Sequence, residues 1–184
     1  PLDKTQYKLD EHSRRFIAAS PFVVLGTNGD VSPRGDDPGF VHVIDDNTVL
    51  LPDRKGNNRL DSMQNIVEDP TVALMFLIPG ISETFRIRGE AEITTDPALL
   101  EPLAVNGQVP ASGLIIHVKE AYIHCAKAIL RSKIWGEDNK LDRKEFAATK
   151  IIAAHTNRSQ ADYDAYYEDN MKQAMAEEGR EYDK

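Results

Sequence analysis

Residues 50–59 read Leu-Leu-Pro-Asp-Arg-Lys-Gly-Asn-Asn-Arg, which places a glycine, two asparagines and three basic residues where a strand gives way to a helix. The first N–H groups of a helix have no partner within it and lie at the positive end of its dipole, so such a junction suits a phosphate. Gly56 permits close backbone approach, and Arg59 can add a charge-assisted hydrogen bond. The alternative, on this segment alone, is that Asn57 or Asn58 simply caps the helix.

The residues before this junction predict a short helix followed by a meander of antiparallel strands. Asn28-Gly29-Asp30 is a strong hairpin signal, and Asp45-Asp46-Asn47 suits a second tight turn. The predicted helix covers residues 9–19, and the predicted strands cover residues 22–26, 31–34, 41–44 and 48–51.

The residues after the junction continue with a helix and longer strands. Leu60, Met63, Ile66 and Val67 recur at helical spacing until Asp69-Pro70 ends that helix. Further strands are predicted at residues 72–77, 85–93 and 114–124, and a short helix at 96–104.

Residues 85–93 show the clearest alternation in the chain. Apolar or small residues occupy the odd positions and charged residues the even ones, as in a strand buried on one side. With six or seven such strands and few helices, the sequence predicts a mainly β fold, an antiparallel barrel with flanking helices.

The composition excludes several classes of function. A net charge of −8 over 184 residues argues against nucleic-acid binding through a basic surface, and a single cysteine, Cys125, excludes a disulfide framework or a multi-cysteine metal site. The longest apolar run, residues 72–79, is far too short for a membrane helix, and the charged start shows no signal peptide. We expect a cytoplasmic protein without a bound metal.

The character of the sequence changes from Lys140 onward. The tail is polar and acidic, with Tyr163, Tyr166 and Tyr167 spread through it, and it predicts one or two helices. We expect residues 1–139 to form the barrel and residues 140–184 to be a helical extension of the same domain. The tyrosines can supply contact area to the barrel or a partner, or they can be occasional anchors of a solvated helix.

Two further motifs flank the junction. Ser32-Pro33-Arg34-Gly35-Asp36 precedes it, and the string from Pro79 to Gly89, which ends Arg-Ile-Arg-Gly, follows it. Together with the Gly-Asn-Asn-Arg helix start and the Phe76-Leu77 strand end, they occur in an order that resembles the pyridoxamine 5′-phosphate oxidase-like flavoprotein superfamily. The resemblance runs from about Phe16 to Trp135 and is closest to a bacterial branch of that superfamily.

The resemblance implies a homodimer of two FMN-binding split barrels with the flavins at the shared interface. Arg34 falls where the family has an arginine that approaches the flavin, and Gly35 continues that strand. Pro52 and Asp53 fall on the strand end beside the flavin. The other residues that the resemblance places at the flavin mononucleotide (FMN) are Arg54, Asn57, Asn58, Arg59, Thr84 and, as a cap from the partner subunit, Arg131 and Trp135.

The chain departs from the oxidases proper at three places. Asn57-Asn58-Arg59 stands where they have Ser-Arg-Lys, which loses one positive charge that Arg54 can replace. Thr84 stands where they have a glutamine that bonds the flavin ring. They also hold pyridoxamine phosphate through an Arg-x-His pattern that residues 122–135 lack, which argues against that substrate.

Three functions therefore stay open. The leading one is an FMN-dependent oxidoreductase acting on an unidentified small molecule, in which the flavin carries the chemistry and no catalytic residue is predicted. An F420-dependent reductase would need a larger basic cluster. A non-enzymatic flavin or haem binder is the third, with His42, His117 or His155 as the axial ligand of a haem.

The remaining chemical groups near the end of the last strand carry less weight. His117 and His124 are seven positions apart, an odd separation, which predicts opposite faces of that strand. Cys125 follows His124 directly, and because neighbouring strand residues point apart we do not expect a nucleophilic pair.

Overall fold

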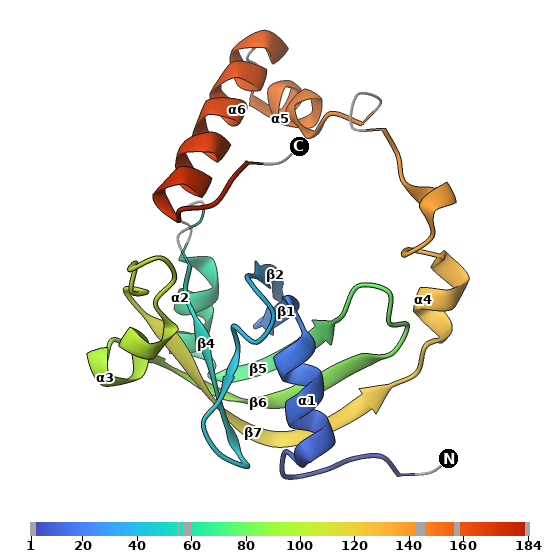
Figure 1. The fold of residues 1–184 in the computed structure, drawn as a ribbon, viewed down its shortest axis with the longest axis vertical. Helices are drawn as coiled ribbons and strands as arrows, with labels where there is room; N and C mark the ends of the chain where they lie inside the picture. Colours follow the sequence, from blue (N-terminus) through green and yellow to red (C-terminus); the bar gives the residue numbers. More distant parts are fainter. Residues whose placement is uncertain (1–2, 55, 57–59, 143–145, 157–158, 183–184) are drawn as a thin grey trace. The chain divides into compact units, whose positions relative to one another are not determined.

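The structure of the chain is a computed structural model that describes residues 3–54, 56, 60–142, 146–156 and 159–182. It divides into two compact units, one of residues 1–104 and 109–135 and the other of residues 105–108 and 136–184. The first unit holds the sheet and the second holds the C-terminal helices (Figure 1).

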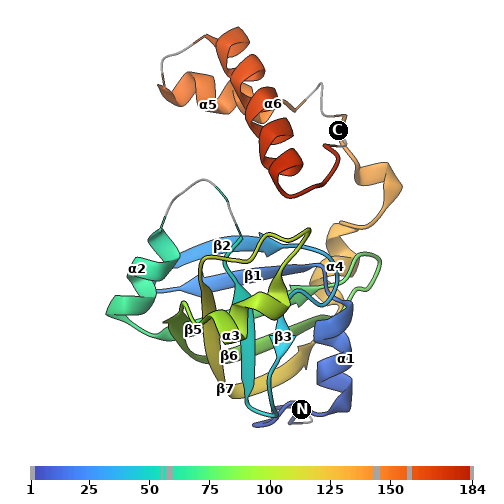
Figure 2. The same ribbon diagram turned by 60° about the vertical axis from the view of Figure 1, so that its left-hand side comes forward.

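The first unit is built on one seven-stranded antiparallel sheet in the order β2-β1-β5-β6-β7-β4-β3. The predicted mainly β split-barrel fold is confirmed. Figure 2 shows how strongly the sheet curls. Its strands are β1 (Phe22–Thr27), β2 (Asp30–Gly35), β3 (His42–Val43), β4 (Thr48–Pro52), β5 (Thr71–Leu77), β6 (Thr84–Thr94) and β7 (Gly113–His124).

Short helices flank this sheet. The short helix predicted at residues 96–104 begins with α3 (Pro97–Leu100), and the carboxylate of its N-cap residue, Asp96, accepts a hydrogen bond from the backbone N–H of Ala98. A helix that the sequence pattern did not reveal, α4, follows β7. The helices of this unit are α1 (Glu11–Ala19), α2 (Asp61–Glu68), α3 (Pro97–Leu100) with a 3₁₀ turn at Glu101–Leu103, and α4 (Lys127–Ser132).

The core lies on the inner face of the curled sheet and is closed by α1. Ile17 of α1 is fully buried, and the ring of Phe16 lies 5.8 Å from that of Phe85 on β6. The alternation predicted for residues 85–93 is present, with Phe85, Ile87 and Ala91 buried, although Ile93 is 37 % exposed. Helix α2 contributes little to this core. Among the four apolar positions predicted for it, Ile66 alone is buried.

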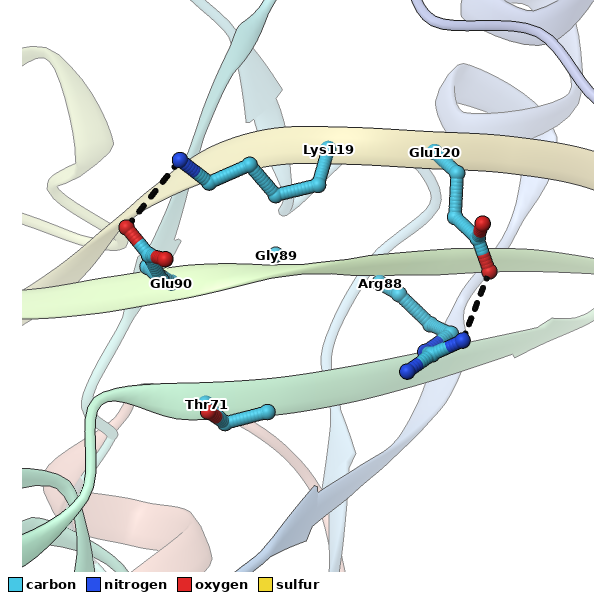
Figure 3. Close-up of a pocket in the computed structure, with 6 residues that line it drawn as sticks. All are labelled: Thr71, Arg88, Gly89, Glu90, Lys119 and Glu120. Atoms are coloured by element: carbon cyan, nitrogen blue, oxygen red, sulfur yellow. Dashed lines mark hydrogen bonds and ion pairs between the residues drawn. The ribbon is translucent and has the colours of Figure 1, made fainter.

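A β-bulge changes the faces of β7. The register between β6 and β7 shifts at Arg88/Gly89, so Lys119 is an extra residue on β7, and it reaches Glu90 at 3.1 Å (Figure 3). His117 and His124 pair with Glu90 and Thr84, two even positions of β6, and so they share one face of the sheet. The prediction that they face opposite ways is wrong, because the extra residue of the bulge shifts the alternation of side chains along β7 by one position.

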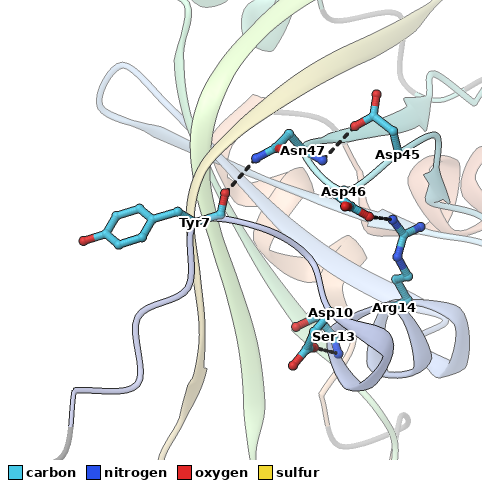
Figure 4. Close-up of polar contacts among 7 residues, drawn as sticks. All are labelled: Tyr7, Asp10, Ser13, Arg14, Asp45, Asp46 and Asn47. Atoms are coloured by element: carbon cyan, nitrogen blue, oxygen red, sulfur yellow. Dashed lines mark hydrogen bonds and ion pairs between the residues drawn. The ribbon is translucent and has the colours of Figure 1, made fainter.

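The turn between β3 and β4 ties the N-terminal segment to the sheet, as Figure 4 shows. The backbone N–H of Asn47 donates to the carboxylate of Asp45 over 2.7 Å, which is the side-chain turn expected from the sequence. The Asn47 amide donates to the Tyr7 carbonyl over 2.7 Å, and Arg14 of α1 pairs with Asp46 at 2.6 Å. These contacts hold α1 in place over the core.

The second unit contains a 3₁₀ turn at Glu137–Asn139 and the two helices α5 (Ala148–Thr156) and α6 (Gln160–Glu177). Ser159 caps α6 through a hydrogen bond from the backbone N–H of Asp162. None of the 18 residues of α6 is fully buried, and α5 buries only Thr149 and Ala153. Within the described ranges, no helix of the chain has the length and apolar character to cross a bilayer.

Candidate functional site

Two strands that lie far apart in the strand order meet at an arginine–aspartate pair. Arg34 lies on β2, an edge strand, opposite the fully buried Val23, so its side chain belongs to the inner face of the sheet. Asp53 directly follows β4, where Val49 and Leu51 face the core. The Arg34 Nη1 donates to Asp53 Oδ1 over 2.6 Å. The pair therefore closes the seam at which the curled sheet returns on itself, and it brings together two predicted site residues.

A second arginine–aspartate pair joins the same two segments of the chain. Arg54 donates from Nε to Oδ2 of Asp36 over 2.5 Å, and the Asp36 side chain is only 4 % exposed. Asp36 comes two residues after Arg34, and Arg54 comes one residue after Asp53. The role of Asp36 was not predicted. The available sequence signal was an acidic residue at the end of the Ser-Pro-Arg-Gly-Asp string.

The Arg34 guanidinium is only partly satisfied. Its Nε is buried and has no hydrogen-bond partner in the described part of the chain, although its Nη1 is held by Asp53. Leaving a buried donor unpaired costs about 1–3 kcal/mol, and more for a charged group. An arginine cannot lose its proton at ordinary pH, so the charge stays at the seam.

The predicted phosphate site lies largely outside the described residues. Asn57, Asn58 and Arg59 belong to the part of the chain that the structure does not describe. Helix α2 begins at Asp61, and its N-cap residue, Leu60, makes no side-chain capping bond. Asp61 lies in the first turn of this helix, where an acidic side chain interacts favourably with the helix dipole.

Thr84 and Trp135 lie at the start of β6 and beside the loop that precedes it, and Arg131 lies on α4. Thr84 is buried at the start of β6 and pairs with His124, the last residue of β7. Trp135 donates from its indole Nε1 to the carbonyl of Ile81 over 2.9 Å, in the loop just before β6. Arg131 lies exposed in the last turn of α4. The hydrogen bond of Trp135 fixes its ring beside the loop that leads to Thr84.

The pairing of Pro52 shows how Asp53 is separated from Thr84 along β7. Pro52 is buried and pairs with Gly113, the first residue of β7, whereas Thr84 pairs with the last. The Asp53 side of the predicted site and the Thr84 side therefore lie at opposite ends of β7. Gly35, exposed on β2, pairs with Phe22 at the end of β1.

Two pockets of the first unit are lined by described residues outside the predicted site. One of about 180 Å³ lies beside the bulge (Figure 3), where Arg88 pairs with Glu120 and Lys119 with Glu90. The other, of about 540 Å³, lies along α2 and includes the exposed Val67 and Ile93. Since its charged groups pair with one another, the first pocket offers a ligand little uncompensated charge.

The other chemically active groups are exposed. All five histidines lie at the surface, and His117 pairs with Glu92 at 3.2 Å. Cys125 is exposed just beyond the end of β7. Among the described residues, no cluster of three or more His, Cys, Asp or Glu side chains has the arrangement to hold a metal ion.

Solved structures share the fold of this chain at low sequence identity. HupZ of Group A Streptococcus is 19 % identical, with a TM-score of 0.50 over 62 % of this chain and 92 % of that one. A variant of HupZ is 18 % identical, with a TM-score of 0.50 over 63 % and 99 %. A putative pyridoxamine 5′-phosphate oxidase of Lactobacillus delbrueckii is 18 % identical, with a TM-score of 0.47 over 65 % and 99 %.

The sequence itself carries the assignment to a family. The comparison with curated proteins gives no match. The family model described as pyridoxamine 5′-phosphate oxidase matches residues 9–125, which include every strand of the sheet and α1 and α2. Because this match covers more than half of the chain, the protein belongs to the pyridoxamine 5′-phosphate oxidase family.

Proposed function

We propose that the chain is an FMN-binding flavoprotein that works as a homodimer and acts as an oxidoreductase on a small organic molecule. Family membership supports a flavin, and one of the similar solved structures, from Syntrophomonas wolfei, is described as an FMN-binding protein. The observation that carries the proposal in this chain is the pair of arginines at the seam, one of them with a buried, unpartnered Nε.

The donors at the seam fit the anionic end and the polar ring of a flavin mononucleotide. In the described part of the chain, the buried Nε of Arg34 has no acceptor and the terminal nitrogens of Arg54 have no partner. Arginine binds phosphate oxygens with two parallel hydrogen bonds where its geometry allows. In this proposal Arg54, Asn57, Asn58 and Arg59 hold the phosphate, and Arg34 with Asp53 lies beside the ring.

The flavin supplies hydride or electron transfer when bound, and the chain binds and orients it. Thr84 and, from the partner subunit, Arg131 and Trp135 complete the site in this proposal. The position of Thr84, at the opposite end of β7 from Pro52, agrees with a site assembled from several strands and two subunits.

The substrate of the proposed oxidoreductase is not pyridoxamine phosphate. The segment of the family's Arg-x-His pattern is occupied here by the end of β7, α4 and Trp135, and residues 122–135 contain no such pattern. The alternative of a haem binder would use an exposed axial histidine, and the candidates His42, His117 and His155 are all exposed.

The test is a titration of the purified protein with FMN and with riboflavin, which lacks the phosphate. We expect quenching of flavin fluorescence and a rise in unfolding temperature, since a ligand at 100 times its Kd adds about 2.7 kcal/mol of stability. Arg59→Ala should weaken FMN at least about tenfold while changing riboflavin little. No response to either flavin would contradict the proposed function, and equal losses for both ligands would contradict the phosphate assignment.

A further inference from the structure

The contact between Arg54 and Asp36 uses the inner nitrogen of the guanidinium, Nε, and not its terminal nitrogens. The carboxylate of Asp36 is 4 % exposed, whereas the Arg54 side chain is 21 % exposed. Asp36 accepts from Nε of Arg54, at the inner side of the guanidinium. The two terminal nitrogens of Arg54 donate no hydrogen bond to the described residues, so they can bind another acceptor.

The neighbouring pair uses the opposite arrangement. Arg34 gives a terminal nitrogen, Nη1, to Asp53, and its Nε is left buried and unpaired. A guanidinium has a side face made of Nε and one terminal nitrogen, and an end face made of both terminal nitrogens. Of the two arginines, only Arg54 keeps its end face uncommitted.

The Asp36 carboxylate is itself held by the backbone. Its Oδ1 accepts from the N–H of Asp37 over 2.8 Å, and the Asp36 N–H donates to the carbonyl of Pro21 over 3.1 Å. A buried carboxylate needs such partners, because an unpaired buried charge is strongly unfavourable. Asp36 is therefore a fixed anchor, and Arg54 is the movable partner.

We propose that Asp36 is a positioning residue for the phosphate end of the site: it holds Arg54 by Nε so that the two terminal nitrogens bind a phosphate monoester dianion. This inference rests on the proposed function and adds to it a residue that the family resemblance did not supply. Arg54 in this way makes up for the positive charge that the Asn-Asn-Arg helix start lacks.

A rival role for Asp36 gives the opposite sign. If its carboxylate only opposed the phosphate by charge repulsion, Asp36→Asn would tighten FMN binding. If it positions Arg54, the same change weakens FMN binding because the terminal nitrogens lose their orientation. The sign of one measured change thus separates the two roles.

The experiment measures the Kd of FMN and of riboflavin for the full chain and its variants. We expect Asp36→Asn and Arg54→Ala each to weaken FMN about tenfold and riboflavin less than twofold, with no further loss in the double variant. Arg54→Lys should lose nearly as much as Arg54→Ala, because a lysine cannot bond Asp36 and offer two further fixed nitrogens. This variant leaves buried Asp36 in place, so it keeps the test valid if Asp36→Asn does not fold.

Asp46→Asn is the matched control, since it changes the exposed Arg14–Asp46 pair of 2.6 Å, at the opposite end of β4 from Arg54, and should change neither Kd. Tighter FMN binding by Asp36→Asn, equal losses for both flavins, or full FMN affinity in Arg54→Lys would each overturn the inference while the wild-type titration still supports a flavoprotein. A wild-type chain that binds neither flavin would overturn both.

Discussion

At the scale of single residues, Asp10 shows how one carboxylate links helix formation to pH. It caps α1 by accepting from the backbone N–H of Ser13 over 2.8 Å, and this bond holds the pKa of Asp10 below its ordinary value. A lowered pKa in the folded state means that the stabilisation is present above the unfolded pKa, about 3.9, and is lost as the pH falls through the folded pKa.

Asp10→Ala should therefore lower the free energy of unfolding by about 1 kcal/mol at pH 7, and this difference should shrink as the pH falls below about 4. Urea unfolding followed by circular dichroism between pH 7 and pH 3 measures it. Asp10→Asn is the control, because asparagine caps a helix as well and does not titrate. A loss in Asp10→Ala that stays constant over this pH range would refute the explanation.

At the scale of elements, the junction of β6 and β7 depends on a residue without a side chain. A Cβ placed on Gly89 would lie 2.3 Å from the backbone carbonyl oxygen of His117, next to the bulge at Lys119. The backbone of one strand would have to move to make room. The bulge and the glycine thus belong to one local arrangement, which also sets the direction of His117 and His124.

Gly89→Ala should destabilise the fold by about 2–3 kcal/mol, since the clash is with backbone rather than with a flexible side chain. Gly26→Ala on β1 is the matched control, because its nearest neighbour would lie 3.6 Å away, an ordinary contact. Its effect should be below about 1 kcal/mol. Chemical denaturation of both variants decides the matter, and similar stabilities for the two would argue against the steric account.

At the scale of the whole molecule, the apolar core lies in one unit. Both clusters of buried apolar residues fall between Leu9 and Ala121, whereas α6 has no fully buried residue. The prediction that residues 140–184 belong to the same domain as the barrel is not tested by this distribution. The distribution of buried apolar residues predicts that the unit with the sheet folds without the C-terminal helices.

A chain that ends at Trp135 should unfold cooperatively, with a midpoint within a few degrees of the full chain, because it keeps both core clusters and the Trp135–Ile81 bond. Thermal unfolding by circular dichroism is the measurement. A truncated chain that aggregates or melts without a transition would show that the helices complete the domain, as the sequence predicted.

Much of the fold could be predicted because the signals are local. The alternation of residues 85–93 gave a strand, and the Asp45-Asp46-Asn47 turn formed as expected, since both depend on neighbours in sequence. Helix α4 was missed because six residues with no buried member leave no periodic signal. The faces of β7 were wrong because a bulge is visible only when two strands are paired.

By itself, the sequence determined the strands, the turns and the family, and it predicted a set of site residues. Only the tertiary structure decided which of those residues meet, and it added Asp36 to them. Arg34 and Asp53 are 19 residues apart, and Asp36 and Arg54 are 18 apart, on segments that no short-range rule brings together. They come into contact because the sheet curls until β2 reaches the end of β4, and a charge buried at that seam needs an opposite charge beside it.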